Sequence, residues 1–151
     1  MEILIDLSNK SPKPDLIVWP ETAVYWLPEE NPEKLKVIAE QLKSPLIFGA
    51  LRFNRDTKKL FNAIFLIDRE GKIQSTYDKT FLVPFGEYLP LRGLLKYLNI
   101  FNNSYRSVDS FSSGTGLKLI KKSEFPIFLP CLLYTSPSPR DLWISRMPSS
   151  A

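Results

Sequence analysis

Residues 14–23 read PDLIVWPETA, an apolar run between two prolines that is followed by an acidic residue. Residues 15–19 predict a short strand covered on both faces of a sheet, because strands buried in this way are continuous apolar runs. Glu21 follows directly, at the strand end where α/β folds usually place reactive groups. Desolvation there would raise the pKa of its carboxyl group toward a range useful for a general base. From position alone, capping of the following turn is the alternative role for Glu21.

Other apolar segments predict further strands of the same domain. Residues 45–53 and 60–68 are apolar runs separated by a polar turn, which predicts a hairpin. Residues 72–78 alternate between two faces and predict a strand near the edge of the sheet. Shorter strands are predicted at residues 117–121 and 125–129, after a change from loop-forming to apolar residues.

Helices are predicted before and between these strands. Residues 2–8 carry apolar side chains on one side, as a short helix would. Asn31 can cap a second helix, in which Pro32 is tolerated at the first position. The buried stripe of this second helix is predicted to be Leu35, Ile38, Ala39 and Leu42. Leucines at helical spacing predict a third helix at residues 91–98, and residues 102–116 predict a surface loop. This order of elements indicates an α/β or α+β layered domain.

The composition excludes several kinds of catalytic site. The 151 residues include no histidine and one cysteine. Neither a Ser-His-Asp or Cys-His site nor an ordinary zinc site can therefore be built from this chain alone. The net charge of +4 comes from scattered basic residues, which argues against nucleic acid as a partner. We expect no membrane span and no signal peptide within these residues, because no apolar stretch approaches the roughly 20 residues that a spanning helix needs.

Two further charged residues follow the strand predicted at residues 72–78. Lys79 comes at its end and could offer an ammonium group to a developing oxyanion. Lysines at strand ends are mostly solvated, so Lys79 considered alone is a weak candidate. Glu87 lies in a loop between Gly86 and Tyr88, where it is either a supporting carboxylate of a site or an exposed loop acid.

Two long motifs make these candidates more specific. They are PDLIVWPETA at residues 14–23 and YDKTFLVPFGEYLP at residues 77–90, and FSSGTG at residues 111–116 follows them. Together they resemble the carbon-nitrogen hydrolase (nitrilase) superfamily, and within it the apolipoprotein N-acyltransferases of bacterial envelopes. The resemblance covers roughly residues 1–130. It implies a nitrilase-like α-β-β-α sandwich, truncated at its C-terminal side.

The resemblance also implies roles for the candidate residues. The superfamily uses a Glu-Lys-Cys triad, in which Glu21 corresponds to the general base and Lys79 to the cation that stabilises the tetrahedral intermediate. Glu87 matches an additional glutamate that supports the site. A carboxylate held beside an ammonium group can activate a thiol without imidazole, so such an enzyme can lack histidine. No metal or organic cofactor is implied.

The end of the chain departs from the family's pattern. Cys131 falls too early for the nucleophile motif and lacks the glutamate that follows the family's cysteine. Residues 131–151 are rich in serine and proline, show no periodicity and resemble translated sequencing-adapter read-through. We therefore expect a partial carbon-nitrogen hydrolase domain at residues 1–130 and a non-native or disordered tail at residues 131–151. Cys131 is interpreted as a chance cysteine.

The activity that the resemblance implies is transfer of a fatty acyl chain through a thioacyl-enzyme. The donor would be a membrane phospholipid and the acceptor the N-terminal diacylglyceryl-cysteine of an apolipoprotein. The implied location is the bacterial inner membrane, with the catalytic domain on the periplasmic side and the transmembrane segments outside this chain. Because the nucleophile motif is interrupted, we expect the 151-residue chain itself to be inactive.

Two other functions stay open at this point. A soluble nitrilase or amidase would use the same triad on a small amide, with water as the acceptor. A nonenzymatic fragment would only associate with partners or membrane through exposed apolar surface.

Overall fold

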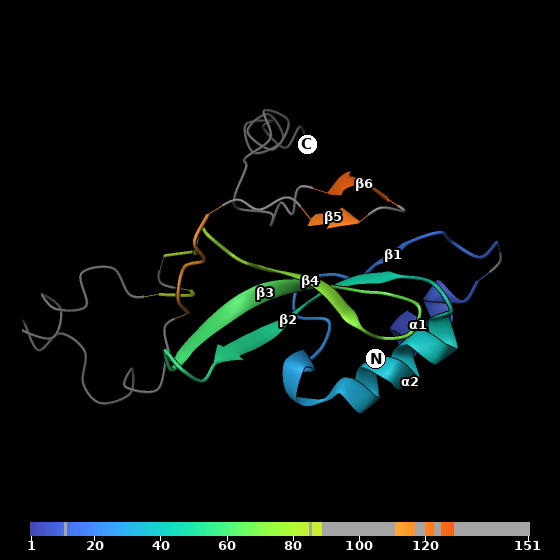
Figure 1. The fold of residues 1–151 in the computed structure, drawn as a ribbon, viewed down its shortest axis with the longest axis horizontal. Coiled ribbons are helices and arrows are strands. Elements are labelled where there is room, and N and C mark those ends of the chain that lie inside the picture. The colour runs from blue at the N-terminus through green and yellow to red at the C-terminus, as the bar shows by residue number, and fades with distance from the viewer. Residues whose placement is uncertain (11, 85, 89–110, 117–119, 123–124, 129–151) are drawn as a thin grey trace, which may run out of the picture.

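The computed structural model describes residues 1–10, 12–84, 86–88, 111–116, 120–122 and 125–128. Its centre is a four-stranded sheet in the order β1-β2-β3-β4. The strands are β1 (Ile17–Val18), β2 (Leu46–Asn54), β3 (Lys59–Ile67) and β4 (Ile73–Asp78). β1 runs parallel to β2, and the other neighbouring pairs are antiparallel (Figure 1). The predicted hairpin is confirmed as β2 and β3, and β4 lies at one end of the sheet, as its alternation predicts.

Two α-helices and one 3-10 turn pack on one side of this sheet. They are α1 (Glu2–Ser8), η1 (Pro28–Glu30) and α2 (Pro32–Leu42). All four residues of the predicted stripe of α2 are buried. Asn31 precedes α2, but its side chain donates to the carbonyl of Leu27 at 2.9 Å and makes no capping bond to the helix. The predicted helix is therefore confirmed, whereas its predicted side-chain cap is wrong.

The core divides between the two faces of the sheet, because successive residues of a strand point to opposite faces. The larger cluster joins α2 to one face and contains residues such as Leu35, Phe48 and Phe65. The rings of Phe48 and Phe65 are stacked, with their centroids 5.6 Å apart. The opposite face carries a smaller cluster that includes Leu66 and Tyr77. A separate pair of strands, β5 (Ile120–Lys122) and β6 (Phe125–Phe128), lies on the side of the sheet opposite α2 (Figure 1).

The first strand differs from its prediction. β1 comprises two residues, of which Ile17 is buried and Val18 is 67% exposed. The side chain of Ile17 joins the core beneath the sheet, whereas Val18 faces the other way, where the described residues leave it open. The prediction that this strand is covered on both faces is therefore wrong for the described part of the chain, although its position and its parallel pairing suit an α/β sheet.

The remaining predictions fall partly outside the described residues. β5 and β6 confirm strands near residues 117–121 and 125–129. Within the predicted loop, residues 111–116 have no helix or strand. The predicted helix at residues 91–98 and the tail at residues 131–151 lie outside the described residues. None of the helices in the described ranges is long and apolar enough to cross a membrane.

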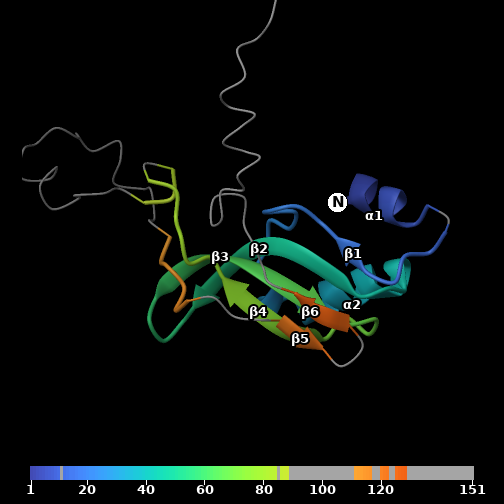
Figure 2. The same ribbon diagram turned by 90° about the horizontal axis from the view of Figure 1, so that it is seen from above.

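The 111–116 segment (orange) and the loop that contains Glu87 (yellow-green) lie beside each other, near the turn between β2 and β3 and away from α1 (Figure 1 and Figure 2). The ends of β1 and β4 open onto the same region as these two loops. This region contains all three charged residues that the sequence predicts for the site.

Candidate active site

Glu21 lies in a tight turn that follows β1 and is fixed to β2. Gly49 of β2 donates its N–H to the carbonyl of Pro20 at 3.2 Å and accepts from the N–H of Val24 at 3.3 Å. A Cβ atom at position 49 would lie 2.7 Å from Cα of Glu21. Only glycine lets the turn approach β2 so closely, so Gly49 sets the position from which the Glu21 side chain extends.

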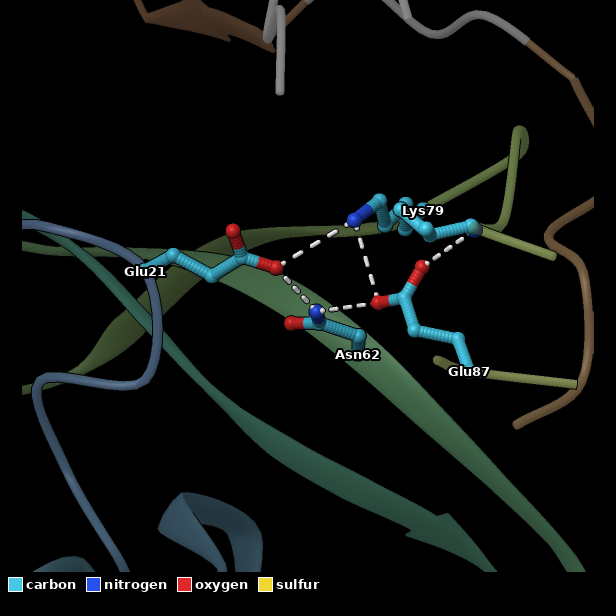
Figure 3. Close-up of polar contacts among 5 residues, drawn as sticks. Glu21, Asn62, Lys79 and Glu87 are labelled. Carbon is cyan, nitrogen blue, oxygen red and sulfur yellow. Dashed lines mark hydrogen bonds and ion pairs between the residues drawn. The ribbon is translucent and has the colours of Figure 1, made fainter. Parts of the chain in front are cut away.

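Lys79 follows β4 directly and extends its side chain between two carboxylates. Its Nζ lies 3.3 Å from Oε1 of Glu21 and 3.0 Å from Oε1 of Glu87 (Figure 3). The side chain of Lys79 is 2% exposed. A buried ammonium group needs opposite charge and hydrogen bonds in place of water, and the two glutamates supply both. Lys79 therefore differs from an ordinary solvated lysine at a strand end.

Glu87 has both carboxylate oxygens engaged. Oε1 accepts from Nζ of Lys79 and, at 2.9 Å, from Nδ2 of Asn62, while Oε2 accepts from the backbone N–H of Val83 at 2.8 Å (Figure 3). Burial by itself would raise the pKa of Glu87. The donors from Asn62, Val83 and Lys79 outweigh burial, so the pKa lies below its ordinary value of 4.5. Glu87 is thus a fixed, ionised partner of Lys79.

Glu21 has one oxygen engaged and the other open. Its Oε1 accepts from both Nζ of Lys79 and Nδ2 of Asn62, and no described residue bonds to Oε2. The side chain is 38% exposed, whereas that of Glu87 is 12% exposed. The expected desolvation of Glu21 is therefore wrong for the described part of the chain. The arrangement leaves Oε2 of Glu21 accessible for accepting a proton.

Asn62 is a member of this cluster that the sequence analysis missed. It lies in β3, is buried, and donates to both glutamates, while its backbone carbonyl accepts from the N–H of Lys79 at 2.8 Å. The signal that could have identified it is an amide side chain inside the apolar run LFNAIFLI, because a buried polar group requires hydrogen-bond partners.

The 111–116 segment ties the Lys79 and Glu87 loops together through its backbone. Phe111 donates to the carbonyl of Glu87 and Gly114 to the carbonyl of Lys79, both at 2.9 Å. A Cβ atom at position 114 would clash with the backbone carbonyl group of Asp78, so glycine is required for this approach. The motif at residues 111–116 thus supports the site by fixing the backbone beside two of its charged residues.

A second ion pair anchors the end of β4, next to Lys79. Arg52 donates to both oxygens of Asp78, with Nε to Oδ1 at 2.7 Å and Nη2 to Oδ2 at 2.6 Å. The guanidinium group also lies 4.7 Å from the ring centroid of Phe61. Such a planar, two-bond contact fixes the direction of the backbone that leads into Lys79.

The structure therefore brings together Glu21, Lys79 and Glu87, as the sequence predicts. Cys131 lies outside the described residues. Within the described ranges, no group of three or more His, Cys, Asp or Glu side chains is placed to hold a metal ion. The cluster can accept a proton at Glu21 and can stabilise nearby negative charge through Lys79.

Comparison with known proteins agrees with this fold. The sequence model of the carbon-nitrogen hydrolase family matches residues 2–124, and the chain belongs to this family. Several curated relatives are named apolipoprotein N-acyltransferase. The protein of Brucella suis biovar 1 (strain 1330) is 35% identical over 146 residues, which cover 93% of this chain and 27% of the relative. That of Rhizobium leguminosarum bv. trifolii (strain WSM2304) is 42% identical over 100 residues, which cover 62% of this chain and 19% of the relative.

Solved structures show the same fold at lower identity. A carbon-nitrogen hydrolase from Helicobacter pylori G27 aligns with a TM-score of 0.52 at 17% identity, over 81% of this chain and 40% of that one. An N-terminal amidase in complex with a Gln-Val peptide aligns with a TM-score of 0.52 at 19% identity, over 83% of this chain and 31% of that one. These similarities establish a nitrilase-like α/β fold. The chain spans about a quarter of the length of the curated relatives, 27% in the Brucella suis case.

Proposed function

We propose that this chain acts as part of a longer apolipoprotein N-acyltransferase. That protein would move a fatty acyl chain from a phospholipid to the N-terminal diacylglyceryl-cysteine of an apolipoprotein. The observation that carries the proposal is the contrast between the two glutamates on Lys79: one is fully engaged, and the other keeps an open oxygen. The 35% identity to a protein of that name supports the choice of reaction.

The first half of the proposed reaction forms a thioester on a cysteine of the longer protein. Oε2 of Glu21 takes the thiol proton, and the thiolate attacks the ester carbonyl carbon of the phospholipid. The carbonyl electron pair moves to oxygen, where the positive charge of Lys79 stabilises the oxyanion. When the intermediate collapses, the C–O ester bond breaks and the lysophospholipid oxygen takes the proton from Glu21.

The second half transfers the acyl group to an amine. The free α-amino group attacks the thioester carbonyl carbon, and Glu21 accepts a proton from the nitrogen as the amide bond forms. The C–S bond breaks, and the released thiolate recovers its proton from Glu21. Glu87 stays ionised throughout and balances the charge of Lys79, so neither half needs a cofactor.

The proposed location is the bacterial inner membrane, with this domain on the periplasmic side. The phospholipid donor and the lipid-bearing acceptor would both reach the site from the membrane surface. The experiment that tests the reaction uses the longer protein, obtained by extending the genomic reading frame on both sides of this chain. Purified in detergent with phospholipid and a diacylated lipopeptide, it should add one acyl chain to the peptide amine, which mass spectrometry detects.

The same preparation distinguishes the alternative reaction. Release of ammonia from a small amide, with no acylation of the lipopeptide, would show that the protein hydrolyses amides and does not transfer acyl chains. The 151-residue chain alone should form no thioacyl adduct with phospholipid, because the motif around Cys131 is interrupted. A thioacyl adduct on Cys131 would contradict that expectation and assign Cys131 as a nucleophile.

A further inference from the structure

Asn62 contacts every charged residue of the site. Its Nδ2 group donates to Oε1 of Glu21 and to Oε1 of Glu87, and its backbone carbonyl accepts from the N–H of Lys79 (Figure 3). The residue lies within β3, between β2 and β4, and is 5% exposed. A position inside the sheet is more rigid than the two loops that carry Glu21 and Glu87.

The orientation of the Asn62 amide follows from its surroundings. The NH₂ group carries two N–H donors, one for each carboxylate. The reverse orientation would place Oδ1 against two carboxylate oxygens, which is repulsive, so the hydrogen-bond network fixes the assignment. Two glutamates face the ammonium group of Lys79 here, and the amide supplies further hydrogen-bond donors to both of them.

The other end of the amide is unsatisfied. Oδ1 of Asn62 is buried, and none of the described residues donates a hydrogen bond to it. A buried acceptor without a donor is unfavourable for folding. An apolar residue in the interior of β3 would avoid this unfavourable buried acceptor. The benefit of asparagine at position 62 therefore comes from the two N–H groups of its side chain.

We propose that Asn62 is a positioning residue, whose amide bridges Glu21 and Glu87 and holds Oε1 of Glu21 toward Lys79 while Oε2 faces outward. Glu21 is attached to a turn and is partly exposed, so it depends on this bond more than the enclosed Glu87 does. Without the bridge the Glu21 carboxylate would rotate into solvent. The effect on activity rests on the acyl transfer proposed above, whereas the bridge can be tested without any reaction.

The direct test is NMR of the Asn62 side-chain amide in the 151-residue chain. Glu21→Gln should shift one Nδ2 proton resonance upfield and Glu87→Gln the other, because a neutral amide oxygen is a weaker acceptor than a carboxylate. The side-chain amide of Asn54, at the far end of β2, should not move in either variant. The bridge is refuted if both Asn62 proton resonances stay unchanged in both variants.

The functional test compares Asn62→Asp with Asn54→Asp in the longer protein. Asn62→Asp removes both donors and adds negative charge. It should slow thioacyl formation about 100-fold, since a small misplacement of a reacting group has effects of that size. The acid limb of its pH profile should also move to higher pH, which a loss of folding alone would not cause. In Asn54→Asp the carboxylate can still accept a hydrogen bond from the N–H of Thr57. The rate of thioacyl formation and its pH profile should therefore match those of the unsubstituted longer protein.

The two tests separate the possible failures. An Asn62→Asp protein with the parent rate and the parent acid limb would overturn the positioning role. If the unsubstituted longer protein forms no thioacyl adduct, the proposed function fails, and the NMR result still decides whether Asn62 bridges the glutamates. If Asn62→Asp does not fold, the NMR test is unaffected, because it leaves Asn62 in place.

Discussion

Glu21 and Glu87 share the Lys79 ammonium group, but Glu87 uses both of its oxygens in hydrogen bonds and Glu21 uses one. The two carboxylates thus have different surroundings although they lie in one cluster. Glu87 is held by three donors and is the more enclosed of the two. Glu21 is open on one side, which suits a group that takes up and returns a proton.

Removing the buried charge should destabilise the fold. Lys79→Met leaves two carboxylates facing each other without their shared cation. Breaking a buried ion pair in this way costs about 3 kcal/mol or more. The free energy of unfolding from urea titration should fall by about that amount, while Lys72→Met, at an exposed lysine beside the same strand, should change it by less than about 0.5 kcal/mol. Equal effects of the two substitutions would refute the buried pairing of Lys79.

Glu87 should make stability depend on pH in the acidic range. Its pKa is lowered in the folded state from an ordinary value of 4.5. The unfolded chain therefore binds the proton more readily, and the stabilisation is complete above pH 4.5 and is lost as the pH falls through the folded pKa. Glu87→Gln should flatten this part of the stability profile, measured by urea titration at several pH values. Glu40→Gln, on the exposed side of α2, should leave the slope unchanged, and an equal slope in the Glu87 variant would refute the prediction.

Arg52 should depend on its planar shape as well as on its charge. Arg52→Lys keeps the charge but loses the two-bond contact with Asp78 and the position over Phe61, so unfolding should become easier by about 1 kcal/mol. Arg55→Lys is the matched control, because its pair with Glu30 is exposed and contributes little to stability. Thermal or urea unfolding compares them. If Arg52→Lys is as mild as the control, the pair does not anchor β4.

Gly114 should not accept a side chain. Gly114→Ala places a methyl group against the carbonyl of Asp78, and overpacking of this kind costs about 1–3 kcal/mol. Hydrogen exchange should also show faster exchange of the N–H groups of Phe111 and Gly114, which bond to the two site loops. Gly86→Ala meets Val83 only at an ordinary 3.5 Å and should be tolerated. Unchanged exchange at Gly114 in its alanine variant would show that the segment does not clamp the site.

The sequence predicted the two described α-helices and the strands β2, β3 and β4 well because their signals are local. The apolar stripe of α2 and the hairpin of β2 and β3 depend on spacing and on turn residues within a short segment. The length of β1 was not predictable in this way. Whether the side chain of Val18 is covered depends on which residues pack against that face of the sheet. The sequence of β1 itself does not specify those residues.

The site residues were predicted through motifs, which also implied different roles for Glu21 and Glu87, but the exposure and the contacts of these residues were not predicted. Glu21, Lys79 and Glu87 are recognisable because each sits in a long, ordered motif. The exposure of Glu21 and the burial of Lys79 follow from how three loops meet beside β3, which no single segment specifies. Asparagine is uncommon in strands, but Asn62 belongs to none of the motifs that identified the other site residues. The sequence analysis therefore missed it.

The central claim is that Glu21 is the proton acceptor of an acyl transfer through a thioester. Its most direct test is the mass of the intact longer protein after incubation with phospholipid, with Glu21→Gln compared against Glu40→Gln. We expect a hydroxylamine-sensitive acyl adduct in the parent and in Glu40→Gln, and none in Glu21→Gln. An adduct that forms at the parent rate in Glu21→Gln would contradict the claim.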